Sequence, residues 1–427
     1  MSFKDFNLQH GILKAVQQCG YTTPTPIQSE AIPKILAGCD LIASANTGTG
    51  KTAAFVLPAL QSLAKQRRFK KQSGKPSILI LTPTRELATQ VSQAIRNYGK
   101  NLRFYSVILV GGMPYRPQLK SLSRPVDIVV ATPGRLIDHI NSRRIDLSNV
   151  NMLILDEADR MLDMGFVDEV NQIAEMTQTD RQTLLFTATW DNQLSALARR
   201  LLNEPERIQI ETEPTQHNIE QRLHIADDID HKNRLLHHLL DDDNLTQALI
   251  FSATKIGADI LAQELIAQGH SAAALHGDMK QGARNRTLMN MRRGKLRLLV
   301  ATDVAARGLD VTSISHVINF DIPRFAEDYV HRIGRTGRAG ATGTAISFVL
   351  PEDAIHLERI ERYTGQKVDQ HIIPGLEPTR KLRSRHQQKR KYRGKGSSQP
   401  RKYYSAPKRR GGGRYNQPPA HHKPQAR

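Results

Sequence analysis

The sequence predicts an α/β protein with two domains, each built around a parallel β-sheet, followed by a basic tail. Short runs of branched apolar residues alternate with helical patterns over most of the 427 residues, as in doubly wound parallel sheets. A polar stretch with one proline, residues 211–217, interrupts the alternation and is typical of an interdomain linker. Apolar residues become rare after Pro374. We therefore expect domains over residues 1–210 and 218–374 and a tail over 375–427.

The positive charge of the chain is concentrated in this tail. The net charge is +20, and 17 of the 61 Lys and Arg residues lie between Arg380 and Arg427, where there is no Asp or Glu. The other 379 residues carry 44 basic and 41 acidic groups. A segment this poor in apolar residues cannot bury a core, so we expect it to be disordered. Its scattered tyrosines and basic groups suit the bases and phosphates of a nucleic acid; a tail that only keeps the protein soluble is the alternative.

The first predicted strand, residues 41–43, runs into a loop with the pattern of a phosphate-binding loop, and a helix follows. Glycines in such a loop let backbone N–H groups approach a phosphate, and the helix N-terminus adds a favourable dipole. We expect Lys51 to reach the β- and γ-phosphates of a nucleotide and the Thr52 hydroxyl to bind Mg²⁺. The general pattern begins with Gly. The loop here comprises Ala45, Asn46, Thr47, Gly48, Thr49, Gly50, Lys51 and Thr52.

A proline-containing turn, residues 20–28, precedes this loop. The amide of Gln28 can donate and accept at once, so it can pair with both N6 and N7 of an adenine. Tyr21 offers a ring for stacking. The alternative is an ordinary turn before a helix.

The apolar run from Leu153 to Leu155 predicts a buried strand, which is followed at once by acidic residues. Ligands of parallel sheets bind beyond the carboxyl ends of the strands. We therefore expect Asp156 to hold Mg²⁺ through water and Glu157 to orient or deprotonate an attacking water. A strand end with a solvated acidic turn is the alternative.

Other predicted strands of the first domain also end in polar motifs. The motifs are residues 82–87, 111–112, 132–135 and 187–189. Because the carboxyl ends of parallel strands share one edge, we expect the motifs to line one rim of the sheet. Small hydroxyls, glycine N–H groups and Arg are suited to a sugar-phosphate backbone. For each Thr-Pro pair, helix capping is the alternative.

The second half repeats the alternation without a phosphate loop of its own. Its polar motifs are residues 302–310 and 331–338, and the second of these is rich in Arg and Gly. Arg335 and Arg338 could act as arginine fingers on the γ-phosphate of a nucleotide held by the first domain. A basic surface loop is the alternative.

Together these motifs resemble the DEAD-box ATP-dependent RNA helicases, and within them the bacterial subgroup that includes RhlE and SrmB. The resemblance runs from Phe3 to about Val349 and implies two RecA-like domains in tandem. It implies adenine contacts by Phe3 and the 20–28 turn and a ribose contact by Asp310. Asp159, Thr187 and Thr189 would couple hydrolysis to domain movement, with Thr187 where the family usually has Ser. The implied RNA contacts are Pro83, Thr84, Arg85, Gly112, Thr132, Pro133, Gly134, Arg135, Gly277, Gln281, Arg284, Thr302 and Asp303.

The function implied by this resemblance is RNA-stimulated ATP hydrolysis, with ATP and Mg²⁺ as cofactors, coupled to local opening of short RNA duplexes without sequence readout. A DNA helicase and a nucleotide-gated RNA-binding or annealing factor remain alternatives. Ribosomal precursors and the RNA-degradation machinery are candidate partners. The first residues do not resemble a signal peptide, and no apolar run approaches the ~18 residues of a membrane span. We therefore expect a cytoplasmic location and no membrane partner.

Overall fold

The computed structural model describes residues 2–45, 48–65, 73–210, 219–306, 311, 313–337, 341–380 and 382. Most of the predicted tail and all of the predicted linker lie outside these residues. The last strand of the first domain ends at Gln209, and the first strand of the second domain begins at Ile219. The predicted domain boundaries stay predictions.

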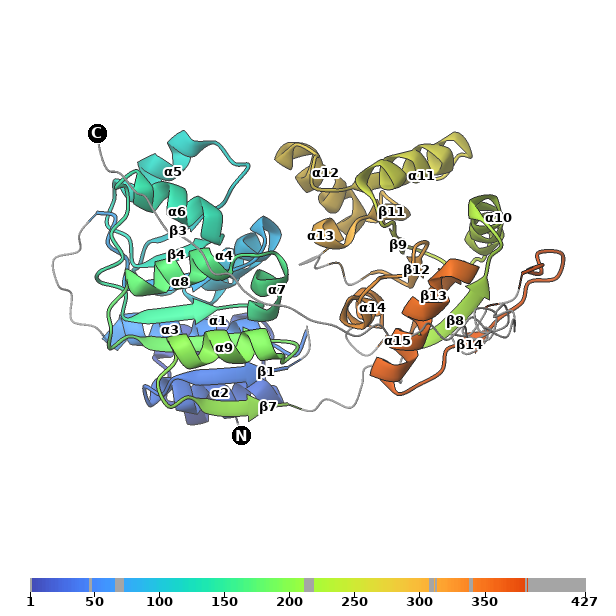
Figure 1. The fold of residues 1–427 in the computed structure, drawn as a ribbon. Coiled ribbons are helices and arrows are strands. Elements are labelled where there is room, and N and C mark those ends of the chain that lie inside the picture. Colours follow the sequence, from blue (N-terminus) through green and yellow to red (C-terminus); the bar gives the residue numbers. More distant parts are fainter. Residues whose placement is uncertain are drawn as a thin grey trace, which may run out of the picture. The chain divides into compact units, whose positions relative to one another are not determined.

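The first domain is built on a sheet of seven parallel strands in the order β3-β4-β2-β5-β6-β1-β7 (Figure 1). Leu81 of β2 is paired with Ala131 of β4 and with Leu155 of β5, so three central strands end together. The strands are β1 (Leu41–Ser44), β2 (Ile78–Leu81), β3 (Ser106–Leu109), β4 (Ile128–Ala131), β5 (Met152–Leu155), β6 (Gln182–Thr187) and β7 (Glu206–Gln209).

Helices cover both faces of this sheet, which is why its central strands are continuously apolar. Ile78 and Ile80 of β2 belong to the core on one face, with α1 to α4, and Leu79 and Leu81 to the core on the other, with α6 to α9. The helical elements are η1 (Phe3–Phe6), α1 (His10–Gln18), α2 (Pro26–Leu36), α3 (Lys51–Lys65), α4 (Arg85–Tyr98), α5 (Tyr115–Leu122), α6 (Pro133–Asn141), α7 (Ala158–Asp163), α8 (Val167–Glu175) and α9 (Asn192–Leu201).

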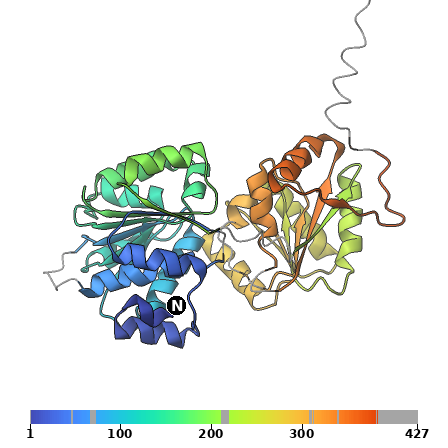
Figure 2. The ribbon, with the colours of Figure 1, turned by 90° about the horizontal axis from the view of Figure 1, so that it is seen from below.

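The second domain has the same architecture, a parallel sheet with helices packed around it (Figure 2). Its strand order is β10-β11-β9-β12-β13-β8-β14. Its strands are β8 (Ile219–Ile225), β9 (Ala248–Phe251), β10 (Ala272–Leu275), β11 (Leu298–Ala301), β12 (His316–Asn319), β13 (Gly343–Val349) and β14 (Asp369–Gln370). Its helical elements are α10 (Ile229–Leu240), α11 (Lys255–Ala267), α12 (Gln281–Arg292), α13 (Asp303–Ala306), α14 (Ala326–Ile333), η3 (Pro351–Asp353) and α15 (Ala354–Thr364).

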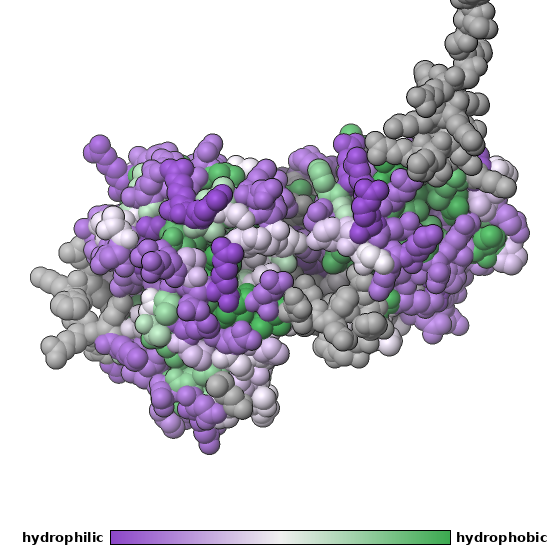
Figure 3. All heavy atoms as spheres, turned by 60° about the horizontal axis from the view of Figure 1, so that its bottom comes forward, coloured by the Kyte–Doolittle hydropathy of each residue, from purple (hydrophilic) through white to green (hydrophobic). Residues whose placement is uncertain are grey.

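The predicted α/β class with parallel sheets is confirmed. The sequence patterns missed three strands, β7, β8 and β14. β7 is the edge strand next to β1 in the first sheet, and β8 and β14 are the last two strands at the corresponding edge of the second sheet. Hydrophilic side chains predominate on the face shown in Figure 3, with hydrophobic ones in small groups. Within the described residues, no helix combines the length and the apolar character that crossing a membrane requires.

Candidate active site

The loop after β1 places a lysine and a helix N-terminus together. Gly48 and Gly50 have φ values of +90° and +94°, a region that favours glycine. Lys51 begins α3 and is buried, and its Nζ donates to the carbonyl oxygens of Ala45 (2.7 Å) and Thr187 (3.2 Å). Helix N-termini favour anions, so the loop suits a phosphate. Of the predicted loop residues, Asn46 and Thr47 lie outside the described part.

Gln28 is brought to this loop by the N-terminus of α2. Its Nε2 donates to the carbonyl oxygen of Gly50 at 3.1 Å, and its Oε1 accepts from the backbone N–H of Thr25 at 3.0 Å. A Cβ on Gly50 would lie 2.4 Å from that Nε2, so any larger residue there would displace the Gln28 amide. Tyr21 is 45% exposed, whereas Phe3 is buried against Phe6. Adenine contacts of Phe3, Tyr21 and Gln28 stay predictions.

Asp156 and Glu157 follow β5 and are both buried, at 3% and 5% exposure. Burial and the adjacent Glu157 carboxylate raise the pKa of Asp156 to about 7, although the Lys51 charge acts in the opposite direction. Glu157 has φ and ψ of +54°, a left-handed conformation that costs a non-glycine residue about 1 kcal/mol or more. Two buried carboxylates beside this loop have the chemistry that a cation and a reacting water require, and these roles of Asp156 and Glu157 stay predictions.

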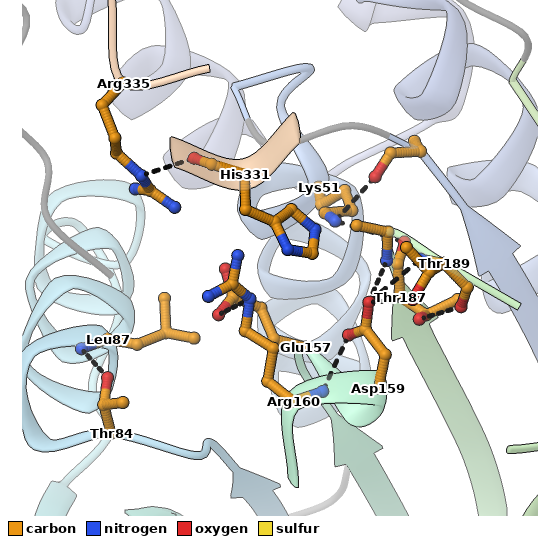
Figure 4. Close-up of polar contacts among 12 residues, drawn as sticks. Lys51, Thr84, Leu87, Glu157, Asp159, Arg160, Thr187, Thr189, His331 and Arg335 are labelled. Atoms are coloured by element: carbon orange, nitrogen blue, oxygen red, sulfur yellow. Dashed lines mark hydrogen bonds and ion pairs between the residues drawn. The ribbon is translucent and has the colours of Figure 1, made fainter. Parts of the chain in front are cut away.

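Arg160 is a member of this site that the sequence analysis missed. Its side chain is buried, and its Nε lies 3.4 Å from Oε2 of Glu157 (Figure 4). The sequence feature that could have identified Arg160 is its place in the first helical turn after the acidic residues that follow β5. Arg160 therefore holds the Glu157 carboxylate by charge.

Asp159 connects the end of β5 to the end of β6. Its Oδ2 accepts from the backbone N–H groups of Ala188 (3.1 Å) and Thr189 (2.9 Å) and from the Thr189 hydroxyl (2.9 Å) (Figure 4). Burial would raise the pKa of Asp159, but Lys51 and Arg160 outweigh it and lower that pKa. The Thr187 hydroxyl donates to the carbonyl oxygen of Thr189 at 2.7 Å. The three predicted coupling residues thus lie together.

The polar motifs after β2, β3 and β4 also meet at one rim. The Arg85 guanidinium lies against Gly111 and Gly112, where a Cβ on Gly112 would be 1.8 Å from its Nη1. Arg135 donates from Nη1 to the carbonyl oxygen of Met113 at 3.2 Å. A Cβ on Gly134 would meet nothing within 4 Å.

Helix capping explains part of this rim. The Thr84 hydroxyl caps α4 by accepting from the Leu87 N–H at 3.2 Å, and Pro83 lies just before it. Thr132 precedes α6, with Pro133 as the first helical residue, but its side chain makes no capping hydrogen bond. The Thr132 hydroxyl therefore has no capping role to explain its place at the rim.

Four predicted RNA contacts of the second domain have protein partners. Gln281 accepts from Nη1 of Arg85 at 3.0 Å, and Arg284 is 2.8 Å from the Glu86 carboxylate. Asp303 pairs through both oxygens with Arg332, at 2.6 and 2.7 Å. Thr302 is buried directly before it and accepts backbone N–H bonds. Gly277 has only the Lys255 side chain near its Cβ position, at 3.7 Å.

Arg332 is a second residue that the sequence analysis missed. It is 3% exposed, its Nη1 donates to the Asp321 carbonyl oxygen (2.6 Å) and to Asn319 (3.1 Å), and its Cζ lies 4.8 Å from the Phe251 ring centroid. Arg335 of the same motif is buried and donates from Nε to the His331 carbonyl oxygen at 3.3 Å (Figure 4). Asp310 and Arg338 lie outside the described residues.

Comparisons with known proteins agree with this geometry. Residues 25–197 match the family model DEAD/DEAH box helicase, and residues 230–340 match Helicase conserved C-terminal domain. The chain is 44% identical to ATP-dependent RNA helicase SrmB of Escherichia coli, over 88% of this chain and 85% of that protein. It is 41% identical to DEAD-box ATP-dependent RNA helicase CshA of Bacillus subtilis, over 88% and 75%.

Solved structures show the same fold. Dbp5 of S. cerevisiae bound to RNA and ADP BeF3 superposes with a TM-score of 0.75 at 30% identity, over 87% of this chain and 95% of that one. Mss116p bound to ssRNA and AMP-PNP gives a TM-score of 0.78 at 28% identity, over 87% and 79%. The implied arrangement of two RecA-like domains is confirmed.

Proposed function

Because the chain belongs to the DEAD-box family of ATP-dependent RNA helicases, we propose that it opens short RNA duplexes by gripping one strand while ATP is bound. The observation that carries the proposal is the buried Asp156–Glu157 pair beside the Lys51 loop, joined through Asp159 to Thr189. A bent single strand cannot stay paired, so a closed grip on its backbone and 2′-hydroxyls separates the duplex locally. ATP hydrolysis then resets the grip.

The donor set fits Mg²⁺. No group of three His, Cys, Asp or Glu among the described residues can hold a metal ion by itself, and Mg²⁺ with a nucleotide needs only one or two carboxylates. Asp156 has no ion-pair partner in the described part of the chain, and burial together with the neighbouring Glu157 carboxylate raises its pKa. Asp156 and Thr52 would hold the ion, which would neutralise charge on the phosphates.

The remaining roles follow from position. Lys51 would stabilise charge on the β- and γ-phosphates, and Glu157 would orient and deprotonate the attacking water. Arg335 and Arg338 would stabilise the transferring phosphoryl group, with Asp310 at the ribose. Gln28 would read the adenine, with help from Tyr21 and Phe3.

RNA would bind along the rim of each sheet through the predicted glycine, threonine and arginine residues. Phosphate contacts of this kind carry no sequence information. The same proposal places the protein in the cytoplasm, with ribosomal precursors or the RNA-degradation machinery as its context.

The test is steady-state ATP hydrolysis without nucleic acid, with single-stranded RNA and with DNA of matching sequence. We expect strong stimulation by RNA alone, and its loss in Glu157→Gln. Equal stimulation by DNA would indicate a DNA helicase instead.

The basic tail favours a second candidate, a nucleotide-gated RNA-binding or annealing factor. A truncated protein can distinguish the two candidate functions. It should end after Leu382, because Asp227 of the second domain accepts from the backbone N–H groups of Thr379 (2.9 Å) and Arg380 (2.8 Å), and a shorter protein would lose these bonds. A truncated protein that still hydrolyses ATP and unwinds RNA supports the helicase. One that loses both activities supports the binder.

A further inference from the structure

A buried polar cluster lies between the loop after β3 and helix α6, and no motif pointed to it. The rings of Tyr115 (α5) and His139 (α6) are stacked, with centroids 4.4 Å apart and planes 7° apart. His139 is fully buried and Gln118 is 6% exposed. We call Tyr115, Gln118 and His139 the rim brace.

The hydrogen bonds of the rim brace have a defined direction. Nε2 of Gln118 donates to the carbonyl oxygen of Val110 at 3.1 Å, and lies 3.5 and 3.4 Å from the carbonyl oxygens of Met113 and Pro114. Oε1 of Gln118 must therefore be the atom that accepts, and its partner is Nε2 of His139 at 3.2 Å. Burial and the nearby Arg135 charge lower the pKa of His139 to about 4, so a neutral imidazole donates this bond.

The rim brace joins two segments that carry proposed RNA contacts. The carbonyl groups it binds belong to residues 110–114, which include Gly112. His139 lies one helical turn after Arg135, whose Cζ is 5.6 Å from the Tyr115 ring centroid and whose Nη1 donates to Met113. A change in the rim brace would therefore move Gly112 and Arg135 relative to each other.

We propose that Tyr115, Gln118 and His139 are positioning residues that hold Gly112 and Arg135 in a fixed arrangement for the RNA backbone. The inference rests on the proposed function, because it assigns these two residues to the RNA backbone. A backbone segment that is fixed before RNA arrives does not have to be ordered when RNA binds, which strengthens binding. The rim brace touches neither the phosphate loop nor Asp156, so it should affect RNA binding and not ATP hydrolysis as such.

Gln118→Ala tests the proposal against a matched control, Gln61→Ala. Gln61 is also a buried glutamine that binds backbone, accepting from the Gln9 N–H at 2.8 Å, but it braces α3 and the segment before α1. We would measure the Kd for a labelled single-stranded RNA of about ten nucleotides with a non-hydrolysable ATP analogue, together with the RNA dependence of ATP hydrolysis. For Gln118→Ala we expect the Kd and the half-saturating RNA concentration to rise about tenfold, while kcat at saturating RNA and KM for ATP stay within about twofold.

Unchanged RNA affinity in folded Gln118→Ala would overturn the proposal, and so would an equal effect of Gln61→Ala. If Gln118→Ala does not fold, His139→Phe keeps the stack on Tyr115 and removes only the bond to Gln118. Its Kd should rise about threefold, and no rise would count against the rim brace. Failure of the proposed function would look different, because the wild type would then show no RNA-stimulated hydrolysis while the Kd comparison still reported on the rim brace.

Discussion

The two domains have the same strand order, yet the groups at corresponding strand ends behave differently. β1 is followed by a glycine loop and by Lys51, whereas β8 is followed by Asp228, whose side chain caps α10 by accepting from the His231 N–H at 2.8 Å. The Asp228 carboxylate stands where an anion would meet this helix N-terminus, and its charge would repel a phosphate. The glycine loop before α3 contains no acidic residue.

The lysine and aspartate at these ends show the same contrast. In the second domain, Lys232 of α10 is 2% exposed and its Nζ lies 3.0 Å from the Asp321 carboxylate, which follows β12. In the first domain, Lys51 donates to carbonyl oxygens instead, and burial raises the pKa of Asp156. The same scaffold therefore pairs its lysine with its aspartate in the second domain, whereas in the first domain we propose that nucleotide and cation take up the corresponding charges.

The largest expected effect comes from Glu157, a carboxylate that belongs to neither of the lysine–aspartate sets compared above. Glu157→Gln should lower kcat for ATP hydrolysis by about 10²–10⁴-fold, because an amide cannot accept the proton of the attacking water. The binding of ATP and RNA should persist, which equilibrium binding would check. Near-normal kcat would show that Glu157 only orients the water or plays no part.

Replacing each lysine by methionine should separate function from stability. Lys51→Met should lower ATP hydrolysis about 10²-fold with little change in Tm. Lys232→Met removes the ion pair of Asp321 and leaves it only hydrogen bonds from Ser252 and the Ala253 N–H. It should cost about 2 kcal/mol of unfolding free energy, less than for a fully buried pair because Asp321 is one-third exposed. ATP affinity of Lys232→Met should match the wild type. Equal losses of stability in both variants would contradict the contrast between the domains.

Each domain also buries a histidine that must stay neutral. Burial, with Arg135 near His139 and with His371 and Arg222 near His224, lowers the pKa of each to about 4. The unfolded chain binds more protons than the folded one between that value and the ordinary pKa of about 6.5. Stability should therefore fall as pH decreases through this range, by about 2 kcal/mol per histidine.

Denaturant unfolding at pH 7 and pH 4.5 would measure this loss. His139→Phe and His224→Phe should each remove one share of it, in different domains. A variant with the same pH dependence as the wild type would show that its histidine is already protonated in the folded protein.

The sequence predicted those parts of the site that follow strands, because parallel strands end at one edge and Asp156, Lys51 and Arg85 were therefore expected to converge. It could not predict partners that depend on packing between distant segments. Gln118 binds backbone carbonyl groups, which carry no sequence signal, and Asp303 finds Arg332 twenty-nine residues later. β8 was missed because three consecutive polar residues, 220–222, interrupt it, unlike the apolar runs that marked the central strands.

The smallest expected effect concerns hydroxyl groups that bind an aspartate in each domain. In the first, Thr189 donates to Asp159 at 2.9 Å. In the second, Ser252 donates to Asp321 at 3.4 Å, and the Ala253 N–H donates at 2.9 Å. Thr189→Val removes one of the three bonds to Oδ2 of Asp159 and should weaken the link between the ends of β5 and β6 by about 1 kcal/mol.

We expect Thr189→Val to unwind about fivefold less duplex per ATP hydrolysed, because this link joins the nucleotide site to the strand that carries the 187–189 motif. Ser252→Ala is the matched control and should leave that ratio unchanged, since Asp321 already has Lys232 and the Ala253 N–H as partners. The readout is the ratio of strand-separation rate to ATP hydrolysis rate at saturating RNA. If both variants lower the ratio equally, the hydroxyl in the first domain has no special role, and the difference between the domains reduces to the phosphate loop and the carboxylate pair.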